Sequence, residues 1–339
     1  MNKTIKVPTG HIIVLDSIIT KDKQMECLSL GDYGQQHNIK ADFLGYTDDI
    51  KGVNVGNVMP LSEKWVITLS TQFGCSMNCD FCDVPKVGPG INISLVELNY
   101  QMHHALLTGN SRYTKRLNVH YARMGEPTFN WDVITHAQHL KDFVISYGII
   151  CDTIHPVLST MCPKYNNHLQ QYIFTWCYSV KNQLYGGEAG LQFSINSTDE
   201  IQRQTMFRGS ALTLEEISEL SKILPKPLGR KYTLNFAVHN NTIIDGSKLA
   251  QLFNPDYFMC KITPMHENVA CKQGRYILDN GYTTYTPYKP FETELKNAGF
   301  DTLVFIPSYD EDIGKITCGN AILATGDPIN KGSNQIDDN

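Results

Sequence analysis

The feature that most limits the fold of this chain is an alternation of strand-like and helix-like segments between residues 65 and about 322. Strands that alternate with helices form βαβ units, and successive units build a parallel sheet. About six units predict an α/β fold with a closed or partly closed barrel, and a doubly wound open sheet is the alternative. The predicted strands are Val66–Thr71, Leu117–Tyr121, Thr153–Leu158, Leu191–Ile195, Tyr232–Val238 and Tyr257–Ile262. The predicted helices are Leu95–Leu107, Trp131–Phe143, a stretch near Gln170–Val180, Leu214–Leu220, Gly246–Leu252 and Phe291–Ala298.

The segments on either side of this core differ from it in composition. Residues 1–64 combine short β-type runs, His11–Leu15 and Ile39–Phe43, with Gly and Asp turns, which predicts a small β-rich N-terminal extension. Residues 323–339 are rich in Gly, Asn, Asp and Pro, which predicts a flexible polar tail. We therefore expect three parts, with the core at 65–322.

Composition excludes several classes of protein. The chain has 339 residues, 42% of them hydrophobic, which is too apolar for a disordered protein and too long for a disulfide-stapled mini-protein. Its apolar runs fall short of the roughly 20 residues of a membrane span, and MNKTIKVPTG at the start lacks the apolar segment of a secretory signal. We expect a cytoplasmic monomer without membrane association, whose ten cysteines are thiols, metal ligands or redox catalysts.

A cysteine cluster follows the first core strand. FGCSMNCDFC places Cys75, Cys79 and Cys82 in a C-x3-C-x2-C spacing, and three thiolates this close can converge on one metal centre. Zinc normally takes a fourth ligand from a second paired motif, and the sequence has no second C-x2-C. Iron–sulfur clusters normally take four cysteines, so three would leave one iron open to a reactive ligand. Chance clustering of structural thiols is the alternative.

The cysteine spacing, with Phe81 before the last cysteine, resembles the radical S-adenosylmethionine (radical SAM) superfamily. Further segments are similar to the RlmN and Cfr RNA methyltransferases of that superfamily, in the same order and with similar separations. They are STQFGC at 70–75, RMGEPTFN at 123–130, SINSTDEIQ at 194–202 and DEDIGKITCGNA at 310–321. The resemblance implies a partial TIM-type (β/α)6 radical SAM barrel, with its site at the carboxyl ends of the strands.

The resemblance also implies the cofactors and the chemistry. Cys75, Cys79 and Cys82 would hold a [4Fe–4S] cluster whose fourth iron binds SAM, and reductive cleavage of SAM would give a 5′-deoxyadenosyl radical. Cys318 would be the catalytic cysteine, which receives a methyl group from one SAM and delivers it to C2 or C8 of an adenine in RNA. An rRNA or tRNA substrate and an electron donor such as flavodoxin or ferredoxin are implied as partners.

Five residues are candidates for binding SAM. Gly125, Glu126 and Pro127 follow a strand and precede a helix, where Gly permits close backbone approach and Pro stiffens the turn. By resemblance, Glu126 accepts a hydrogen bond from the methionine amine, whereas an acidic residue at a helix start is the structural alternative. Ser194 and Asn196 occupy alternate strand positions, so both are expected to face one side and bind a ribose or carboxylate. The same segment also has the pattern of a cap for the next helix.

The chain departs from the family pattern in two places. Thr68 stands seven residues before Cys75, where the family has a cysteine that resolves the enzyme–RNA adduct through a disulfide with the methyl-carrying cysteine; Cys27 is an alternative thiol. The relatives begin with a helical RNA-binding domain, whereas residues 1–64 here have a β-rich pattern. The acidic residue that the family carries ahead of the core has no clear counterpart.

RNA recognition would then depend on local basic residues. Tyr113, Tyr121 and Tyr232 lie near two basic groups and could stack bases beside phosphate contacts. The groups are Arg112, Lys115, Arg116 and Arg123, and Lys226, Arg230 and Lys231. Two other functions stay open: a radical SAM enzyme of the same descent that acts on another RNA, a nucleotide or a protein, and a non-enzymatic zinc- or cluster-binding protein.

Overall fold

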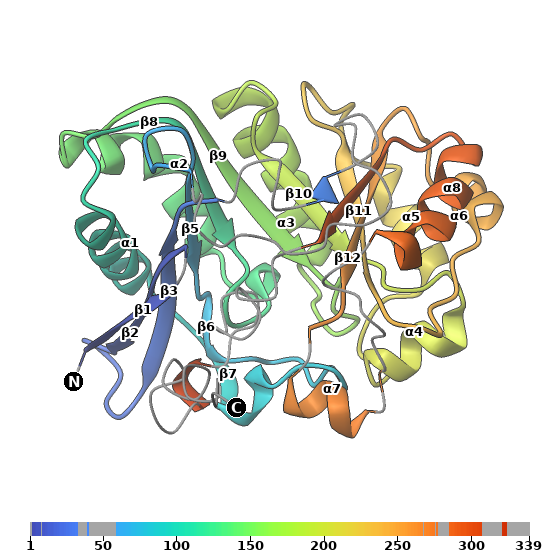
Figure 1. Cartoon of the computed structure of the whole chain (residues 1–339), viewed down its shortest axis with the longest axis horizontal. Helices are drawn as coiled ribbons and strands as arrows, with labels where there is room; N and C mark the ends of the chain where they lie inside the picture. Colours follow the sequence, from blue (N-terminus) through green and yellow to red (C-terminus); the bar gives the residue numbers. More distant parts are fainter. Residues whose placement is uncertain are drawn as a thin grey trace, which may run out of the picture.

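Seven parallel strands form the centre of one sheet in the computed structural model of this chain (Figure 1). In sheet order they are β5 (Trp65–Leu69), β8 (Tyr113–Tyr121), β9 (Ile150–Thr160), β10 (Gly190–Ser194), β11 (Tyr232–Val238), β12 (Phe258–Pro264) and β13 (Thr302–Ile306). The structure describes residues 2–7, 9–32, 39–40, 59–266, 268–274, 276, 285–306 and 321–323. The α/β class with a parallel sheet is therefore confirmed.

Antiparallel strands extend the sheet at both edges. β1 (Lys3–Val7), β2 (Gly10–Asp16) and β3 (Gln24–Leu30) form a meander, and β3 pairs with β5. At the other edge, β4 (Ile39–Lys40) pairs with β13. The N-terminal region is thus β-rich, as predicted, and it continues the core sheet.

The sheet is curled. His120 in β8 and Lys261 in β12 are four strands apart, which would be about 19 Å in a flat sheet at about 4.8 Å per strand. Burial, followed by the charges of Lys261, Arg230, Lys64 and Arg116, nevertheless lowers the pKa of His120 to about 3. The segment after β5 also meets the segment after β12, five places away in the sheet, because Asp83 accepts the N–H groups of residues 269 and 270 at 3.0 Å each, so the sheet curves into a partial barrel. No pairing among the described residues joins the β4 edge to the β1 edge, so closure of the barrel is not observed.

Helices cover the outer face of the curled sheet (Figure 1). α1 starts at Ser94 with a capping box, in which Ser94 Oγ accepts from the backbone of Glu97 and Glu97 accepts from the backbone of Ser94. It ends at Asn110, whose left-handed conformation (φ 50°) closes the helix. The outer helices are α1 (Leu95–Gly109), α2 (Asp132–Ser146), α3 (Leu169–Thr175) with its π-helical continuation η4 (Trp176–Leu184), α5 (Leu214–Ser221), α6 (Gly246–Leu252) and α8 (Lys289–Asn297).

The two faces of each strand have different surroundings. In β8, Leu117, Val119 and Tyr121 are buried in the main hydrophobic core, whereas Arg116 and His120 point to the barrel interior and are partly exposed. This alternation follows from the two-residue period of a strand. The apolar layer thus lies between sheet and helices, and the polar residues gather inside the curl.

The segments that follow the carboxyl ends of the strands gather at one edge of the sheet, the bottom of Figure 1. β6 (Gln72–Gly74) and β7 (Pro89–Asn92) follow β5, α4 (Glu200–Met206) follows β10, and α7 (Val269–Gln273) follows β12. No helix among the described residues is long and apolar enough to cross a membrane.

All the core strands and helices predicted above are present, within a few residues of their predicted bounds. The predicted elements do not include β13, α4 and α7, which are 5, 7 and 5 residues long. Of the predicted tail, only Leu323 is among the described residues. The division into parts at 1–64, 65–322 and 323–339 stays a prediction.

Candidate active site around the cysteine loop

The cysteine loop, residues 75–83, leaves the sheet at the carboxyl end of β5 through the hairpin of β6 and β7. Gly74, the last residue before the loop, has φ +76°, and a Cβ there would lie 2.1 Å from the carbonyl oxygen of Gly88. Only glycine fits such a close approach. Cys75 then donates its backbone N–H to the same Gly88 oxygen at 3.2 Å. The hairpin therefore fixes where the loop begins.

The far side of the cysteine loop is held by elements distant in the sequence. Asp80 donates its N–H to the carbonyl of Met206 at 2.8 Å and pairs with Arg208 at 2.6 Å. Asn268 donates its side-chain amide to the carbonyl of Phe81 at 2.9 Å. The carboxylate of Asp83 accepts the first N–H groups of α7, from residues 269 and 270, at 3.0 Å each. The loop is thus fixed between α4 and α7.

Two of the three cysteines of the loop affect each other electrostatically. Burial raises the pKa of Cys79, and the neighbouring Cys75 raises it further; burial also raises the pKa of Cys75, to about 11. Cys75 Sγ accepts the N–H of Met77 at 3.4 Å, and Cys79 Sγ is 3.7 Å from the sulfur of Met161. Cys82 is partly exposed and donates its N–H to the carbonyl of Cys79 at 3.2 Å. Within the described part of the chain, no three His, Cys, Asp or Glu side chains converge as ready metal ligands.

Glu126 is a buried carboxylate beside the cysteine loop. Its Oε1 accepts from Thr128 N at 3.2 Å, Thr128 Oγ1 at 2.7 Å and Thr160 Oγ1 at 2.7 Å, and its Oε2 accepts from Met161 N at 3.0 Å. Burial raises the pKa of Glu126, and these hydrogen bonds oppose that effect. Glu126 also raises the pKa of Cys75 and Cys79, which places it within electrostatic reach of both thiols.

Gln72 links Glu126 to the cysteine loop. Its Oε1 accepts from the backbone N–H of Glu126 and from that of Ser76, each at 3.1 Å. Gly125 has φ +94°, and a Cβ there would lie 2.5 Å from Cβ of Gln72, so glycine is required at this position. Pro127 is buried and starts the short helix η3 (Pro127–Phe129). Gly125 and Glu126 therefore lie against the segment that leads into the loop, and Pro127 follows them at the start of η3.

The prediction that Ser194 and Asn196 share one face of a strand is wrong. β10 ends at Ser194, and Asn196 adopts a left-handed conformation (φ 64°) beyond the strand. The side-chain oxygen of Asn196 accepts the N–H of Ala237 at 3.1 Å, so this amide fastens the chain to β11. Asp199 caps α4 by accepting the N–H of Gln202 at 2.7 Å, as the capping pattern predicts. Ser194 remains partly exposed at the strand end.

Cys318 lies outside the described residues, as does most of the segment 310–321. Thr68 faces the barrel interior opposite Leu28 of β3. Cys27, the alternative thiol, is fully buried on the other face of β3, where its Sγ is 3.6 Å from the carbonyl of Gln101 in α1. Cys27 therefore does not share the side of the sheet that Thr68 faces.

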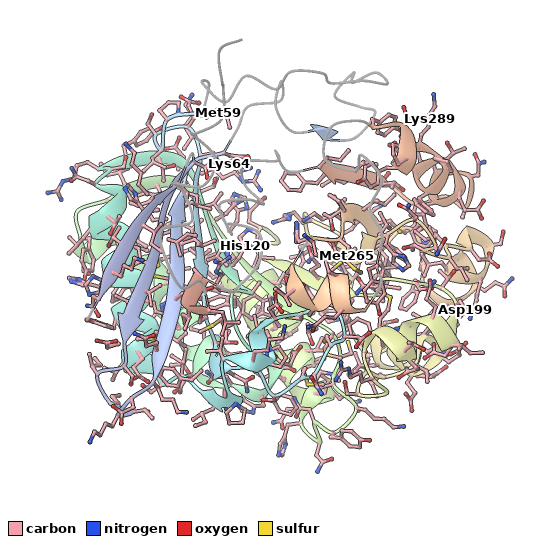
Figure 2. All side chains as sticks on the ribbon, turned by 60° about the horizontal axis from the view of Figure 1, so that its bottom comes forward. Met59, Lys64, His120, Asp199, Met265 and Lys289 are labelled. Atoms are coloured by element: carbon pink, nitrogen blue, oxygen red, sulfur yellow. The ribbon has the colours of Figure 1, made fainter. Side chains whose placement is uncertain are left out.

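The predicted basic groups divide between the barrel interior, the core and the surface. Figure 2 labels His120 and Lys64. The charges of Arg116 and Arg230 act on His120, and Arg116 donates to the side chain of Asn118 at 3.0 Å. Lys261, also inside, has its Nζ 5.2 Å from the ring centroid of Phe305. Of the predicted basic residues, Arg116 and Arg230 thus belong to an inward cationic cluster that also includes Lys261. Those that remain exposed are Arg112, Tyr113, Lys115 and Lys226.

Three residues predicted to contact RNA are buried instead. The hydroxyl of Tyr121 is 2.7 Å from a ring nitrogen of His136, and that of Tyr232 donates to the carbonyl of Pro225 at 2.7 Å. Arg123 Nε pairs with Glu26 Oε1 at 2.8 Å, and both side chains are almost fully buried. None of the three can stack bases or bind phosphate from the surface, because tertiary packing encloses them.

Sequence reasoning missed two buried charged residues of this edge. Glu26, in β3, pairs with Arg123 and accepts the N–H of Ile322, at the start of the short C-terminal turn η6 (Ala321–Leu323), at 3.1 Å. Arg203, in α4, is fully buried behind the cysteine loop. No local pattern marks either residue as buried, since a strand and a short polar helix both carry charges on solvated faces as a rule.

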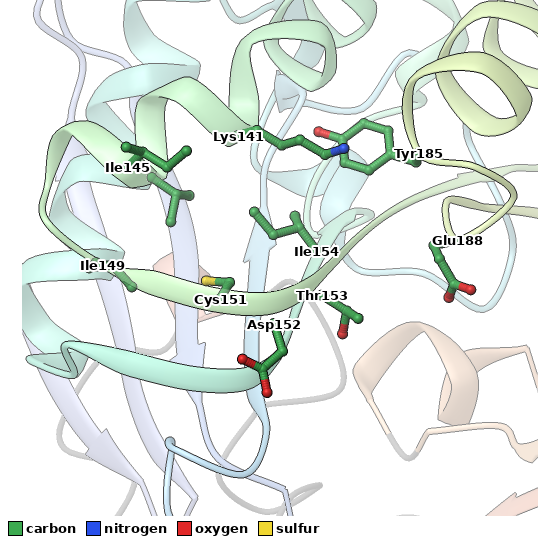
Figure 3. Close-up of a pocket in the computed structure, with 10 residues that line it drawn as sticks. Lys141, Ile145, Ile149, Cys151, Asp152, Thr153, Ile154, Tyr185 and Glu188 are labelled. Atoms are coloured by element: carbon green, nitrogen blue, oxygen red, sulfur yellow. The ribbon is translucent and has the colours of Figure 1, made fainter.

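A surface hollow lies at the opposite edge of the sheet (Figure 3). It is lined by the amino end of β9, including Cys151 and Asp152, with Lys141 of α2 and Glu188. In parallel α/β folds, ligands bind outside the carboxyl ends of the strands. We therefore assign the candidate site to the cysteine loop and not to this hollow.

No protein-family model matches the chain. Among curated proteins, the dual-specificity RNA methyltransferase RlmN of Helicobacter hepaticus (strain ATCC 51449 / 3B1) is 37% identical over 201 residues, which cover 57% of this chain and 50% of the relative. The protein of the same name from Aliarcobacter butzleri (strain RM4018) is 24% identical over 226 residues, covering 64% of this chain and 57% of the relative. The chain thus spans about half the length of these curated relatives. The predicted resemblance to RlmN-type proteins is confirmed.

One solved structure shares the fold of most of the chain. The crystal structure of a radical SAM methyltransferase from Sphaerobacter thermophilus superposes with a TM-score of 0.58 and 13% identity, covering 89% of this chain and 76% of that one. At this identity the similarity shows the fold. It agrees with the curled parallel sheet described above.

Proposed function

We propose that this chain is a radical SAM enzyme of the RlmN type, which methylates C2 or C8 of an adenine in RNA through a methyl group carried on Cys318. The observation that carries the proposal is the cysteine loop held at the carboxyl edge of the sheet against buried Glu126. The similarity to proteins named RlmN supports the same activity. As part of this proposal, the enzyme acts in the cytoplasm as a monomer and takes its electron from flavodoxin or ferredoxin.

The residues of the loop fit a [4Fe–4S] cluster by their chemistry. Cys75, Cys79 and Cys82 supply three sulfur ligands from one short loop, and no fourth cysteine of the motif is present to close the cluster. When bound, the cluster would supply the electron that cleaves SAM. The loop is anchored to α4 and α7, so its cysteines would be held in place while the cluster binds. In this proposal Gly125, Glu126, Pro127, Ser194 and Asn196 surround SAM.

The inward cationic cluster supports an anionic substrate. Arg116, Arg230 and Lys261 line the barrel interior together with His120, where a nucleic-acid phosphate would meet positive charge in a partly desolvated setting. Phosphate contacts bind RNA independently of sequence, so this cluster would position the substrate and not select the base. We propose that an adenine of rRNA or tRNA enters the barrel from the carboxyl edge.

Anaerobic reconstitution with iron, sulfide, SAM and RNA, followed by mass spectrometry of the nucleosides, tests the proposal. We expect visible iron–sulfur absorption and a new methyladenosine. Cys318→Ala should abolish methyl transfer and leave the formation of 5′-deoxyadenosine intact. Cys151→Ala is the matched control, because Cys151 lies at the amino end of β9, away from the loop. Unchanged methylation by Cys318→Ala would refute the methyl-carrier role.

The second candidate is a radical SAM enzyme of the same descent with another substrate, such as a different RNA, a nucleotide or a protein. Thr68 favours it, because a threonine cannot form the disulfide that resolves an RNA adduct in the family. The burial of Arg123, Tyr121 and Tyr232 also removes surface contacts expected for a large RNA. An active cluster without any new methyladenosine would support this candidate. Zinc binding without iron–sulfur absorption would instead support the non-enzymatic alternative.

A further inference from the structure

The inner face of the curled sheet is accessible to water along most of its length. In β5, β12 and β13, buried residues alternate one by one with partly exposed residues, and the carboxyl halves of β8 and β11 show the same alternation. The buried residues of these strands pack in the main core under the helices, so the partly exposed ones face inward. The barrel interior is therefore not filled by its own side chains.

The inward positions of the seven parallel strands carry basic residues and no acid. Arg116 in β8 and Lys261 in β12 both occupy inward positions. The only acid within these seven strands, Asp152 of β9, lies on the outward face, where it accepts from the hydroxyl of Tyr113 at 2.7 Å. A cavity lined by charges of one sign attracts ligands of the opposite sign.

Arg230, two residues before β11, also lies over the inner face. A Cβ added at Gly190 would lie 3.4 Å from Nη1 of Arg230 and 3.3 Å from both methyl groups of Val157. Val157 pairs with His120 on one side and with Gly190 on the other, so these three residues share the inward face. The missing side chain at Gly190 thus leaves room for the guanidinium of Arg230 against the strand.

The side chains of Arg116 and Arg230 approach each other over β9. Arg116 pairs with Thr153, and Gly190, under Arg230, pairs with Val157, four residues further along β9. The strand spacings place the Cα atoms of Arg116 and Gly190 about 16 Å apart. After burial, the charge of Arg116 is the largest effect that lowers the pKa of Arg230. The two guanidinium groups therefore lie near enough to repel each other.

His155 lies between the two arginines on the inner face of β9 and adds no charge at neutral pH. Burial, followed by the charge of Arg116, lowers its pKa to about 4, and Arg230 acts in the same direction. Its Nε2 is 2.9 Å from the hydroxyl of Thr153, and its Nδ1 is 3.1 Å from the half-exposed carboxylate of Glu188. The ring is thus held in place as a neutral group.

The protein does not neutralise the two interior arginines. Arg116 donates Nε to Asn118 at 3.0 Å, and neither Arg116 nor Arg230 forms an ion pair with a described residue. Glu188 is the acid whose charge acts on Arg230, and its effect on the pKa is smaller than that of Arg116. Several N–H donors on one face therefore have no anionic acceptor.

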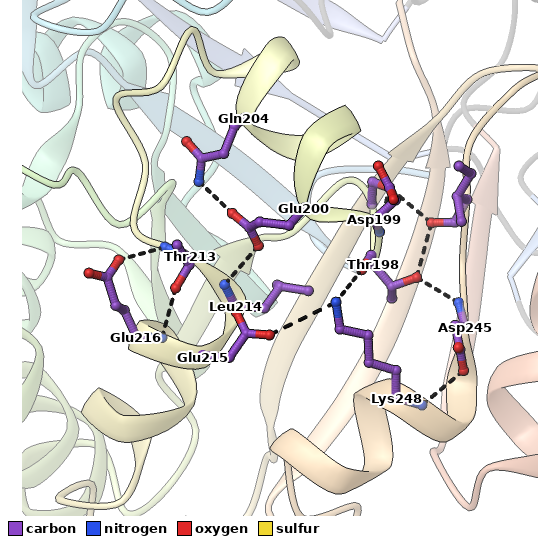
Figure 4. A network of polar contacts seen from close by, with 12 residues as sticks. Thr198, Asp199, Glu200, Gln204, Thr213, Leu214, Glu215, Glu216, Asp245 and Lys248 are labelled. Atoms are coloured by element: carbon purple, nitrogen blue, oxygen red, sulfur yellow. Dashed lines mark hydrogen bonds and ion pairs between the residues drawn. The ribbon is translucent and has the colours of Figure 1, made fainter.

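The polar network around α4 and α5 shows the contrast (Figure 4). There Glu200 accepts from the side chain of Gln204 at 2.6 Å and from the N–H of Leu214 at 3.2 Å. Lys248 donates to the carbonyl of Thr198 at 3.0 Å. The fold thus supplies these charged groups with partners, and it does not do so for the two interior arginines.

Two neighbouring arginines without an acid match the charge and shape of a phosphate group. We propose that Arg116 and Arg230 together bind one phosphate group of the substrate inside the barrel, at a site separate from the cysteine loop. A planar guanidinium binds phosphate oxygens with two parallel hydrogen bonds, and a phosphate between the two groups would replace their repulsion by attraction. The inference rests on the proposed function only in assigning this phosphate to the substrate.

The strands separate the phosphate site from the cysteine loop. Arg116 precedes Tyr121, the carboxyl end of β8, by five residues, or about 17 Å along the strand. Arg230 precedes Val238, the carboxyl end of β11, by eight residues, or about 26 Å. The cysteine loop lies beyond these carboxyl ends. The phosphate would therefore anchor a part of the substrate that is remote from the reacting carbon, and its binding energy would position the rest.

Calorimetric titration of inorganic phosphate into the anaerobically reconstituted full chain tests the site. We expect Arg116→Gln and Arg230→Gln each to weaken phosphate binding on the order of 10- to 100-fold, as the loss of charge-assisted hydrogen bonds would give. Arg112→Gln is the matched control, because Arg112 is exposed and donates to the carbonyl of Tyr147 at 3.0 Å. Its dissociation constant for phosphate should equal that of the wild type.

Thermal unfolding shows whether a variant that does not bind phosphate is still folded. Without phosphate, Arg230→Gln should unfold at the wild-type temperature or above it, because a repulsion between like charges is removed. Millimolar phosphate should raise the unfolding temperature of the wild type and of Arg112→Gln more than that of Arg230→Gln. An equal rise in all three would overturn the proposal, since phosphate also stabilises proteins without binding to a site.

Two further probes distinguish the sources of the phosphate. They are adenosine 5′-monophosphate, compared with adenosine, and an RNA oligonucleotide that lacks a terminal phosphate. Weaker binding of the monophosphate by both arginine variants would identify a terminal phosphate, and weaker binding of the oligonucleotide alone would identify a backbone phosphate. Either result sustains the site.

The remaining outcomes separate this inference from the proposed function. Affinities for phosphate, the monophosphate and the oligonucleotide that neither variant changes would overturn the phosphate site, even if the wild-type enzyme methylates RNA. Absence of binding of all three by the wild type would also overturn it. Binding that depends on both arginines, together with no methyladenosine, would sustain the site and reject only the proposed reaction.

Discussion

Two buried arginines at the carboxyl edge of the sheet differ in what surrounds them. Arg123 pairs with Glu26 at 2.8 Å, and Glu26 in turn accepts a hydrogen bond from the C-terminal turn η6. Arg203 has a stacked aromatic ring and no hydrogen-bond acceptor among the described residues. The first arginine is neutralised by an ion pair within the protein, whereas the second has no acceptor among the described residues. The two buried arginines therefore differ in how far the protein itself compensates their charge.

Glu26→Gln tests the difference between the two arginines most directly, and we expect it to have the largest effect on the unfolding free energy. Removing one partner of a buried ion pair leaves the other charge uncompensated and should cost about 3–5 kcal/mol of unfolding free energy. Urea unfolding of the protein without SAM measures it. The double variant Glu26→Leu/Arg123→Met removes both charges and should recover a large part of the loss. A single Glu26→Gln variant as stable as the wild type would remove the distinction between the two arginines.

Gly125→Ala tests whether the site backbone is fixed by the protein alone. The new methyl group would clash with Gln72, which connects Glu126 to the cysteine loop, in a left-handed conformation that alanine disfavours. We expect a loss of about 2–3 kcal/mol in unfolding free energy. Gly186→Ala is the matched control: its φ is also positive (+56°), and nothing lies within 4 Å of the added carbon. The control should lose only about 1 kcal/mol; equal losses would contradict the importance of the contact.

Asp83→Asn tests the anchor between the cysteine loop and α7, with a smaller effect. Burial alone would raise the pKa of Asp83, but hydrogen bonds from Lys86 and from the N–H groups of Val269 and Ala270 outweigh it and hold the pKa below its ordinary value of 3.8. The stability that the carboxylate contributes is present above that value and is lost as the pH falls through the lower, folded-state pKa. We expect Asp83→Asn to cost about 1 kcal/mol at neutral pH.

A pH series of unfolding experiments checks the sign of this effect. The difference in unfolding free energy between wild type and Asp83→Asn should shrink as the pH falls below about 3.8, where the wild-type carboxyl group also loses its charge. A difference that grows in acid would contradict the assignment.

Arg203→Met is expected to cause the smallest loss of unfolding free energy. It tests the second of the two buried arginines. Methionine fills a similar volume, and replacing an uncompensated buried charge by an apolar group is neutral or stabilising. Without SAM, we expect an unfolding free energy within about 1 kcal/mol of the wild type, or a gain. A loss as large as that of Glu26→Gln would show that Arg203 is compensated within the fold, and the two arginines would no longer differ.

The parts of the site that could be predicted from the sequence are those encoded by local motifs. The cysteine spacing and the segment at 125–127 are contiguous in the chain, so their joint position at the carboxyl edge follows from the strand that precedes each. Asn196 was misplaced because β10 ends two residues earlier and the chain turns through a left-handed residue, which a strand pattern does not reveal. A residue's place past a strand end is set by its local φ and not by the strand's period.

Burial of charges was beyond the reach of sequence patterns. Glu26 and Arg203 are enclosed by segments far away in the chain, and Arg123 was interpreted as a surface residue because basic residues are mostly solvated. Tyr121 and Tyr232 alternate correctly in their strands, but the pattern alone does not say which face meets the helices. Which side chains are buried depends on how the sheet curls and where the helices pack against it.

The hydrogen bond between Ile322 and Glu26 has a consequence for folding during synthesis of the chain. It joins residues 296 positions apart, so a nascent chain on the ribosome cannot form it until nearly all of the sequence described here has been synthesised. Contacts of such sequence separation form late because closing the long loop costs entropy before the contact repays it. The meander, the parallel strands and the cysteine loop can therefore assemble before Glu26 Oε2 accepts its hydrogen bond from Ile322. This edge can therefore be completed only after residue 322 has been synthesised.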